Sequence, residues 1–199
     1  MKQLLSLSIF LLLISNSFAQ NDERYAKAYF ASGCFWCVEE VYEAVRGVHE
    51  VVSGYSGGKK ETATYTQVSA QTTKHAESVE VIYDPNVITY KDLLKVFFNS
   101  GDPTTPNQQG PDRGTAYRSV IFFQNETEEK AAKDYITKLT HDKVFDNTIV
   151  TEVVPFEAFY QAEDYHQNYV KHHPEVPYVQ RVSMPRFEEF QKKCPELLK

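Results

Sequence analysis

Cysteine is scarce in this chain, and so is any excess of positive charge. The 199 residues contain 3 cysteines, an odd number, so the sequence is not a scaffold held together by several disulfides. One pair plus a spare cysteine, or a catalytic set, fits the count better. The formal net charge is −6, which argues against nucleic acid and an anionic membrane surface as partners. Internal repeats are missing as well, and no linker divides the chain.

The chain does contain enough apolar material for one folded domain. Hydrophobic residues make up 42% of it, and 13 Tyr and 13 Phe are not the composition of a disordered segment. We therefore expect residues 20–199 to form a single domain. Its last part, from Pro174 on, is expected to be irregular apart from a turn near residues 187–192.

An apolar segment at the N-terminus is typical of a targeting sequence. Lys2 precedes an apolar run at residues 4–14 that is too short to span a bilayer. Ser-Phe-Ala at residues 17–19 fits a signal-peptidase site, so we predict a signal peptide over residues 1–19. Because Lys2 is the one charged residue in it, cleavage changes the net charge from −6 to −7. We expect a protein secreted across the inner membrane, periplasmic or extracellular, without stable membrane association after cleavage. An uncleaved membrane anchor is the alternative.

The pattern of apolar residues predicts alternating strands and helices. Strands are expected at residues 27–31, 48–55, 78–83, 119–123 and 148–154. Helices are expected after Cys34, after Thr89 as N-cap, over residues 127–141 with Thr127 as N-cap and a Glu126–Lys130 pair, and over residues 162–170. Residues 59–73 and 99–114 are predicted to be long loops. This order indicates an α/β fold, in detail an α+β two-layer sandwich with a ferredoxin-like core and a mixed sheet.

One cysteine lies where the first strand is expected to meet the first helix. The unpaired N–H groups and the dipole of a helix start favour an anion, so the Cys34 thiol is predicted to ionise readily. Ser32 is a candidate cap for the helix, and Gly33 lets the backbone come close to a ligand. The plainer interpretation is that Cys34 is a small residue of the core.

Three further groups of polar residues lie on or beside expected loops, at residues 74–77, 110–119 and 162–169. Each is weak by itself, because a lone Glu on a loop is usually solvated and an Asp next to Gly usually forms a turn. Their order along the chain is the informative feature.

Together these segments resemble a known family. They read Gly-Cys-Phe-Trp at residues 33–36, His-Ala-Glu at 75–77, Gly-x-Asp-x-Gly-Thr-x-Tyr-Arg-Ser at 110–119 and Ala-Glu-Asp-Tyr-His-Gln at 162–167. In this order they resemble peptide methionine sulfoxide reductase of the A type, over about residues 27–169. The resemblance implies a peptide-methionine (S)-S-oxide reductase that repairs oxidised proteins, and possibly free methionine sulfoxide, without a cofactor or metal.

The resemblance also implies roles for the two reactive groups. Cys34 matches the nucleophile, which attacks the sulfoxide sulfur and is left as a sulfenic acid. Glu77 matches the acid that protonates the departing oxygen, and near tyrosines and an apolar floor its pKa should be raised.

Five further residues match the family's substrate site. Tyr65 and Tyr117 match the hydroxyls that hydrogen-bond the sulfoxide oxygen, and Asp112 matches a residue that orders the site. Phe35 and Trp36 match the walls that receive the S-methyl group. Without the family order, each of these would be taken as an ordinary half-buried or core residue.

The thiol that would resolve the sulfenic acid is where the chain departs from the family pattern. The usual Gly- and Cys-rich tail is missing, which leaves Cys37 and Cys194 as candidates. Cys37 lies three residues after Cys34, within reach of an intramolecular disulfide, so we hypothesise that it resolves first and that Cys194 is a relay or inert. Lys74 and Ala116 are smaller departures, in place of a usual Gly and a usual Gln. The reductant would be a thioredoxin-like protein outside the cytoplasm, and we expect a monomer.

Two other classes of protein remain as alternatives. Cys-x-x-Cys after a strand also fits a thioredoxin-like disulfide oxidoreductase, although that leaves Glu77 and the tyrosines unexplained. A metal-binding module would use both of those cysteines with His166, His172 and His173, a poor ligand spacing. A non-catalytic binding domain needs no reactive thiol beside an acid.

Overall fold

The computed structural model describes residues 24–199, so the predicted signal peptide lies outside the described residues. Its centre is a six-stranded sheet in the order β7-β6-β1-β3-β2-β8. The strands are β1 (Ala26–Ser32), β2 (Val48–Ser56), β3 (Ala76–Tyr83), β6 (Ser119–Phe123), β7 (Glu152–Pro155) and β8 (Phe159–Gln161). β6 and β7 run parallel and the other neighbours antiparallel, so the sheet is mixed, as predicted.

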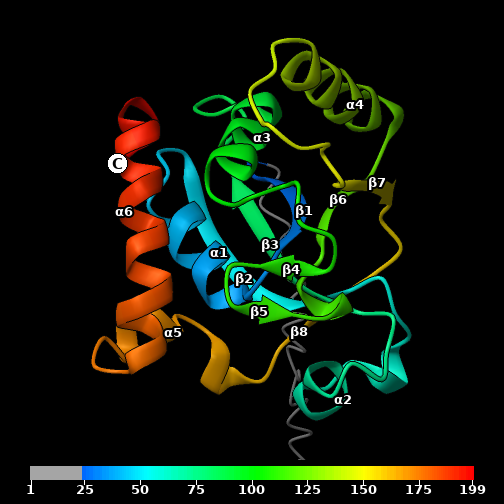
Figure 1. The fold of residues 1–199 in the computed structure, drawn as a ribbon, viewed down its shortest axis with the longest axis vertical. Helices are drawn as coiled ribbons and strands as arrows, with labels where there is room; N and C mark the ends of the chain where they lie inside the picture. The colour runs from blue at the N-terminus through cyan, green and yellow to red at the C-terminus, as the bar shows by residue number, and fades with distance from the viewer. Residues whose placement is uncertain (1–23) are drawn as a thin grey trace, which may run out of the picture.

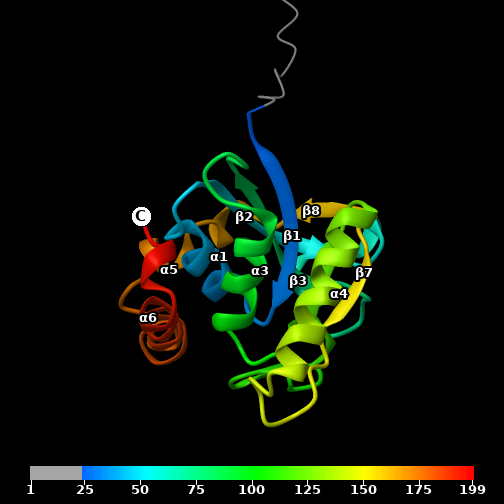
Figure 2. The same cartoon turned by 90° about the horizontal axis from the view of Figure 1, so that it is seen from above.

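Helices α1 (Phe35–Glu43), α3 (Tyr90–Asn99) and α4 (Glu126–His141) pack on the sheet, and α6 (Met184–Lys193) packs against the outside of α1 (Figures 1 and 2). The inner strands β6-β1-β3-β2, with α1 after β1 and α3 after β3, form the β-α-β-β-α-β arrangement of a ferredoxin-like core. The predicted fold is therefore confirmed. Within residues 24–199, no helix is both long and apolar enough to cross a bilayer.

The two faces of β1 explain how the sheet acquires its core. Ala28 and Phe30 point into the large core beneath the helices, where Phe30 stacks on Tyr42 of α1 at 5.3 Å between ring centroids. Tyr29 faces the other way and stacks on Phe156 at 3.7 Å. The alternation follows from the pleat of a strand, and both faces of β1 are buried because it lies near the middle of the sheet.

Some predicted boundaries were wrong in detail. The expected loop at residues 59–73 contains a 3₁₀ turn (Lys60–Thr62) and the short helix α2 (Tyr65–Ser69). The loop at 99–114 contains the hairpin β4 (Gln108–Gln109) and β5 (Asp112–Arg113), and a 3₁₀ turn, Thr115–Tyr117, follows it. In place of a helix over 162–170, the chain forms the 3₁₀ turn Asp164–His166 and then α5 (Tyr169–His172). These elements are too short to produce a readable apolar period.

The helix caps were predicted with mixed success. Thr89 caps α3 with a capping box shared with Asp92, as predicted. Asn125 caps α4 in place of Thr127, and Lys130 pairs with Asp134 at 2.5 Å.

The expectation of an irregular C-terminal tail was wrong. A π-helical segment, Val179–Ser183, leads directly into α6, which ends at Lys193. Pro185 suggests a break, yet it follows directly on the π-helical residues, where the regular i→i−4 hydrogen-bond pattern of an α-helix is already interrupted. Val179 and Phe190 are fully buried, so burial against α1 stabilises this segment. The tail thus becomes part of the wall around the cysteines.

Candidate active site

The site forms where β1 ends and α1 begins. Ser32 is the last residue of β1, and Cys34 is the N-cap of α1 without a side-chain cap, so the expectation that Ser32 caps the helix was wrong. Gly33 between them has φ +80°, and a Cβ there would lie 2.4 Å from Cβ of Gln109. Gly33 is therefore required by backbone conformation and by the close approach of the β4–β5 hairpin.

Glu77, on β3, lies directly beside the start of α1. The Phe35 N–H, in the first turn of the helix, donates to Glu77 Oε2 at 3.1 Å, and the carboxyl is only 2% exposed. The pKa of Glu77 is raised to about 8, chiefly by burial; the Phe35 N–H opposes this rise, and the charges of Asp112 and Cys37 add to it. A carboxyl in this environment carries a proton at neutral pH and is able to donate it.

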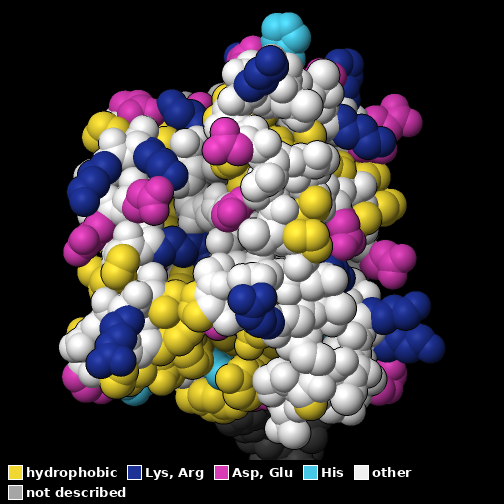
Figure 3. Space-filling view, in the orientation of Figure 1, with side chains coloured by type: hydrophobic (Ala, Val, Ile, Leu, Met, Phe, Trp, Pro, Cys, Tyr) yellow, Lys and Arg dark blue, Asp and Glu magenta, His cyan; other side chains and the backbone are white. Residues whose placement is uncertain are grey.

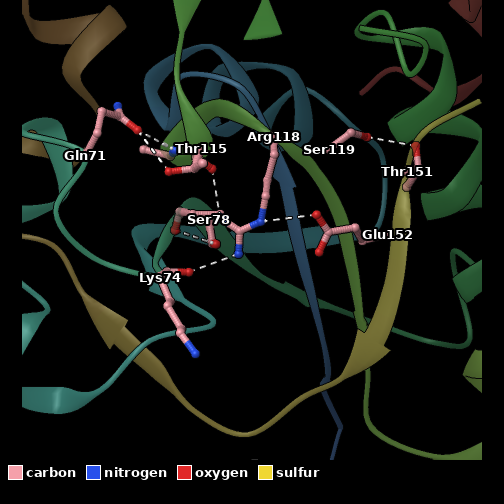
Figure 4. A network of polar contacts seen from close by, with 10 residues as sticks. Gln71, Lys74, Ser78, Thr115, Arg118, Ser119, Thr151 and Glu152 are labelled. Carbon is pink, nitrogen blue, oxygen red and sulfur yellow. Dashed lines mark hydrogen bonds and ion pairs between the residues drawn. The ribbon is translucent and has the colours of Figure 1, made fainter. Parts of the chain in front are cut away.

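The two tyrosines of the predicted site are held on short elements that contact each other. Tyr65 opens α2 and Tyr117 closes the 3₁₀ turn after the hairpin. Gln71 joins these segments, because its Oε1 accepts from the Ala116 N–H at 2.9 Å and from the Thr115 hydroxyl at 3.2 Å (Figure 4). Burial raises the pKa of both phenols, and the charges of Glu77 and Cys34 raise it further, so both hydroxyls lie within electrostatic range of the reacting groups.

Arg118 holds the loops behind these tyrosines. Its guanidinium donates to the carbonyls of Thr115 at 2.8 Å and Lys74 at 3.0 Å, and its Nε lies 3.4 Å from Glu152 (Figure 4). The arginine thus ties the segment before Glu77 to the turn that carries Tyr117. These hydrogen bonds therefore fix the position of Glu77 relative to Tyr117.

An aromatic wall stands beside the thiol. Trp36 stacks on Tyr169 at 3.7 Å between centroids, and its Nε1–H donates to Nδ1 of His166 at 3.1 Å. His166 also contacts Phe35 at 5.0 Å and Tyr65 at 4.4 Å. In the space-filling view, apolar side chains gather around a histidine in the part of the face between α5 and α2 (Figure 3). Phe35 and Trp36 thus belong to one aromatic cluster with His166.

His166, considered from the sequence only as a metal ligand, and Tyr169, in the polar segment 162–169, were not predicted to line the apolar wall. Because His166 Nδ1 accepts the indole hydrogen, its proton sits on Nε2, and burial lowers the pKa of the ring, so the imidazole is neutral. The aromatic spacing of the motif was the signal for these two wall residues.

Cys37 lies on the first turn of α1 and contacts the C-terminal segment. Its Sγ is 3.1 Å from the hydroxyl of Ser183 and 4.0 Å from that of Tyr178. The Tyr178 hydroxyl donates to Asp112 Oδ2 at 2.5 Å, so Asp112 is joined to the cysteine pair through a phenol. The sequence analysis missed Tyr178, Ser183 and Arg186, because that segment was expected to be irregular.

The ionisation of the cysteines differs from the expectation. Burial raises the pKa of Cys34 well above its usual range, and the neighbouring Cys37 and Glu77 raise it further. The pKa of Cys37 is lowered, because the Cys34 thiol donates a hydrogen bond to it and because Arg186, Ser183 and Tyr178 stabilise the thiolate against the opposing effect of burial. In the substrate-free site the pKa of Cys34 is therefore raised, contrary to the expectation from the helix start, and Cys37 is the thiol of the pair whose pKa is lowered.

Cys194 lies apart from this pair. It ends α6, is 0% exposed, and packs in the core near Lys95 and Tyr135. All three cysteines are free. Within residues 24–199, no three His, Cys, Asp or Glu side chains are placed to hold a metal ion, so the histidines of the metal-binding alternative are not gathered around the cysteines.

A cavity also reaches Cys37, away from the aromatic wall. Its volume is about 570 Å³, and it lies between the β4–β5 hairpin and α6, with Cys37, Asp112, Arg181 and Arg186 in its lining. Neither Cys34 nor the aromatic wall lines it. The cysteine pair thus separates an apolar surface from a polar cavity.

A thiol pair beside a protonated, buried carboxyl defines a cysteine-dependent oxidoreductase. The family model for peptide methionine sulfoxide reductase matches residues 26–197. Peptide methionine sulfoxide reductase MsrA 2 of Synechocystis sp. is 48% identical over 174 residues, which are 87% of this chain and 81% of that protein.

Solved structures agree. Mxr1 of Saccharomyces cerevisiae in reduced form has a TM-score of 0.73 at 32% identity, over 78% of this chain and 90% of that one. Mxr1 in complex with Trx2 has a TM-score of 0.53 at 25% identity, over 77% and 91%. The chain belongs to the peptide methionine sulfoxide reductase family. It is an oxidoreductase that reduces methionine S-sulfoxide to methionine, and the resemblance read from the sequence is confirmed.

Proposed function

We propose that Cys34 attacks the sulfur of methionine S-sulfoxide while Glu77 protonates its oxygen. The observation that carries this assignment is the buried Glu77 carboxyl, held by the Phe35 N–H one residue from the thiol and protonated at neutral pH. The Cys34 thiol proton passes to Cys37, its hydrogen-bond partner. The protonated oxygen then passes to the Cys34 sulfur as the sulfur–oxygen bond of the substrate and the new sulfur–sulfur bond break, and the products are methionine and a Cys34 sulfenic acid.

The remaining predicted residues take the roles that the resemblance implied. Tyr65 and Tyr117 donate hydrogen bonds to the sulfoxide oxygen. The support for this pair of roles is that Glu77 and Cys34 both contribute to the raised pKa of each hydroxyl. Asp112 orders the site through its hydrogen bond from Tyr178. Phe35 and Trp36 receive the S-methyl group against the apolar wall.

We infer that Cys37 resolves the sulfenic acid. It lies three residues after Cys34 on the first turn of α1 and its pKa is lowered beside Cys34, whereas Cys194 is enclosed in the core at the far end of α6. Cys37 gives up its proton to Glu77, which donated its own in the first step, and the Cys37 thiolate attacks the Cys34 sulfur. The hydroxyl leaves as water with that proton from Glu77, and an intramolecular disulfide forms. Cys194, considered from the sequence as either a relay or an inert residue, is proposed to be inert.

A thioredoxin-like protein is the proposed reductant. The complex of Mxr1 with Trx2 supports this choice, because Mxr1 shares the fold and family of this chain. Oxidised proteins and peptides that contain methionine sulfoxide are the proposed substrates, and the enzyme acts as a monomer.

The decisive experiment is turnover of the separate S and R epimers of a blocked methionine sulfoxide with a small dithiol. Wild type is expected to reduce the S epimer only, and Cys34→Ser to reduce neither. Mass spectrometry after one turnover without reductant should show a Cys34–Cys37 link and free Cys194. A Cys34–Cys194 link would overturn the assignment of Cys37, and insulin reduction without sulfoxide turnover would favour a thioredoxin-like oxidoreductase.

We also propose that residues 1–19 direct export and are removed after Ala19. The support is the charged, apolar and small-residue pattern of the sequence. The mass of the protein recovered from the periplasm or medium should correspond to a chain that starts at Gln20. Full-length protein retained in the membrane fraction would point to the uncleaved anchor instead.

A further inference from the structure

Ser183 and Arg186, on the segment that runs from the π-helical residues into α6, bring a hydroxyl and a guanidinium to Cys37. Ser183, the last residue of the π-helical segment, is 1% exposed, and its hydroxyl lies 3.1 Å from Cys37 Sγ. When Cys37 is ionised, this hydroxyl is the donor of that hydrogen bond.

Arg186, one turn further on, brings an uncompensated positive charge to the same place. Its guanidinium donates to the Ser32 carbonyl at 2.9 Å, to the Ser32 hydroxyl at 3.2 Å and to the Ser100 carbonyl. Among residues 24–199, no carboxylate forms an ion pair with it. Because neutral oxygens hold the arginine, its full charge acts on Cys37 and on Asp112.

Other groups near Cys37 affect its pKa, and the charge of Cys37 affects the pKa of its neighbours in turn. The Cys34 thiol and the Tyr178 hydroxyl stabilise its thiolate, and the thiolate in turn raises the pKa of Glu77. Asp112 is bound to the same Tyr178 hydroxyl. The Cys34 hydrogen bond is the largest of the stabilising contributions.

That contribution disappears during catalysis. Once Cys34 has become a sulfenic acid, its sulfur no longer carries a hydrogen to donate. Cys37, having taken up the Cys34 proton in the first step, must lose a proton again before it can attack. The groups that still favour its thiolate at this moment are on the C-terminal segment.

We propose that Ser183 and Arg186 are positioning residues for disulfide formation, which hold Cys37 as a thiolate aimed at the oxidised Cys34; this rests on the proposed function of Cys37 as the resolving thiol. In the step itself, the Cys37 sulfur forms a bond to the Cys34 sulfur, and the sulfur–oxygen bond of the sulfenic acid breaks. Glu77, deprotonated in the first step, takes the proton that Cys37 loses and passes it to the hydroxyl, which leaves as water, so no external oxidant is needed.

The first test is an ultraviolet titration of the Cys37 thiolate. It uses the Cys34→Ser/Cys194→Ser background, in which Cys37 is the one remaining thiol. Adding Ser183→Ala or Arg186→Gln should raise the Cys37 pKa by about one unit each, a tenfold smaller thiolate fraction at acidic pH. Ser183→Thr and Arg186→Lys keep the hydroxyl and the charge and should restore most of the shift. A Cys37 pKa equal to that of the background in both Ser183→Ala and Arg186→Gln overturns the proposal.

The second test separates the two chemical steps in single turnover without reductant. In Ser183→Ala and Arg186→Gln, the Cys34–Cys37 disulfide should form about tenfold more slowly at acidic pH, a larger loss than that of methionine formation. Arg181→Gln is the matched control: it removes a positive charge from the same segment, and Arg181 is exposed and makes no hydrogen bond to the pair in residues 24–199.

The outcomes distinguish this inference from the function on which it rests. If wild type produces methionine but no Cys34–Cys37 disulfide, Cys37 is not the resolving thiol, and the inference about Ser183 and Arg186 fails with it. If wild type forms the disulfide, and Ser183→Ala, Arg186→Gln and Arg181→Gln all form it at the wild-type rate, the inference about Ser183 and Arg186 is overturned while the resolving role of Cys37 stands.

Discussion

The backbone N–H of Phe35 donates to the Glu77 carboxyl at 3.1 Å, and this contact joins the first turn of α1 to the centre of the sheet. Phe35 follows Cys34, the proposed nucleophile, directly in sequence, whereas Glu77 is 42 residues away from Phe35. The same backbone turn that presents the thiol therefore fixes the distance between thiol and acid.

Replacement of the acid should abolish most of the activity. In wild type, kcat/KM should fall as pH rises through about 8, because Glu77 loses the proton that it donates. Glu77→Gln should lower kcat/KM by about 10²–10⁴ and lose that limb of the profile. The measurement is S-sulfoxide reduction with a small dithiol on either side of pH 8, and a wild-type limb that persists in Glu77→Gln would contradict the assignment.

The same substitution should stabilise the protein at alkaline pH. Glu77 has a raised pKa in the folded state, so its contribution to stability is full below its unfolded pKa near 4.5 and is lost as pH rises to about 8. The difference of about 3.5 units corresponds to roughly 4–5 kcal/mol. In urea denaturation, the free energy of unfolding of Glu77→Gln should increase relative to that of wild type as the pH rises between these two values. A constant difference would show that the carboxyl is not buried as described.

Gly33→Ala should destabilise the fold and misplace Cys34. The new Cβ would meet Gln109 Cβ at 2.4 Å and Cγ at 2.6 Å, at a φ of +80°. Gly110→Ala is the matched control on the same hairpin, with φ +56° and nothing within 4 Å of the new Cβ. We expect a loss of about 3 kcal/mol or more in Gly33→Ala and about 1–2 kcal/mol in the control by urea denaturation. Equal losses would mean that the hairpin yields freely.

Tyr178 and Asp112 should show energetic coupling. Their 2.5 Å hydrogen bond lowers the pKa of a carboxyl that burial raises, so Tyr178→Phe should raise the Asp112 pKa further. A double-mutant cycle of unfolding free energies with Tyr178→Phe and Asp112→Asn should give about 1–2 kcal/mol. Additive effects, together with an unmoved Asp112 titration by NMR, would show that the bond does not persist in solution.

Cys194→Ala and Cys37→Ala should have opposite consequences. Cys194 is enclosed at the end of α6, so its replacement should cost about 1 kcal/mol of stability and leave thioredoxin-dependent turnover intact. Cys37→Ala should retain one equivalent of methionine formed per enzyme and lose turnover with thioredoxin. Loss of turnover in Cys194→Ala without loss of folding would instead make Cys194 the relay.

The local rules served well where one segment decides its own structure. The strand before Gly33, the helix after Cys34 and the Thr89 cap each depend on neighbours within a few residues, and the structure contains all three. They failed for the segment that contains Ser183 and Arg186, because its helix depends on burial against α1, far away in the chain. They also failed for the Cys34 pKa, since burial and a neighbouring thiol outweigh the helix dipole.

The sequence by itself determined the order of the elements, the motifs in that order, and with them the family and its reaction. Short-range patterns and residue identities are sufficient for these, because they do not depend on which distant segments meet. The tertiary structure decided how far the pKa of Glu77 rises, that the pKa of Cys37 rather than of Cys34 is lowered, and that Cys194 is enclosed. Burial and the field of nearby charges set these properties, and both come from contacts between residues far apart in the chain.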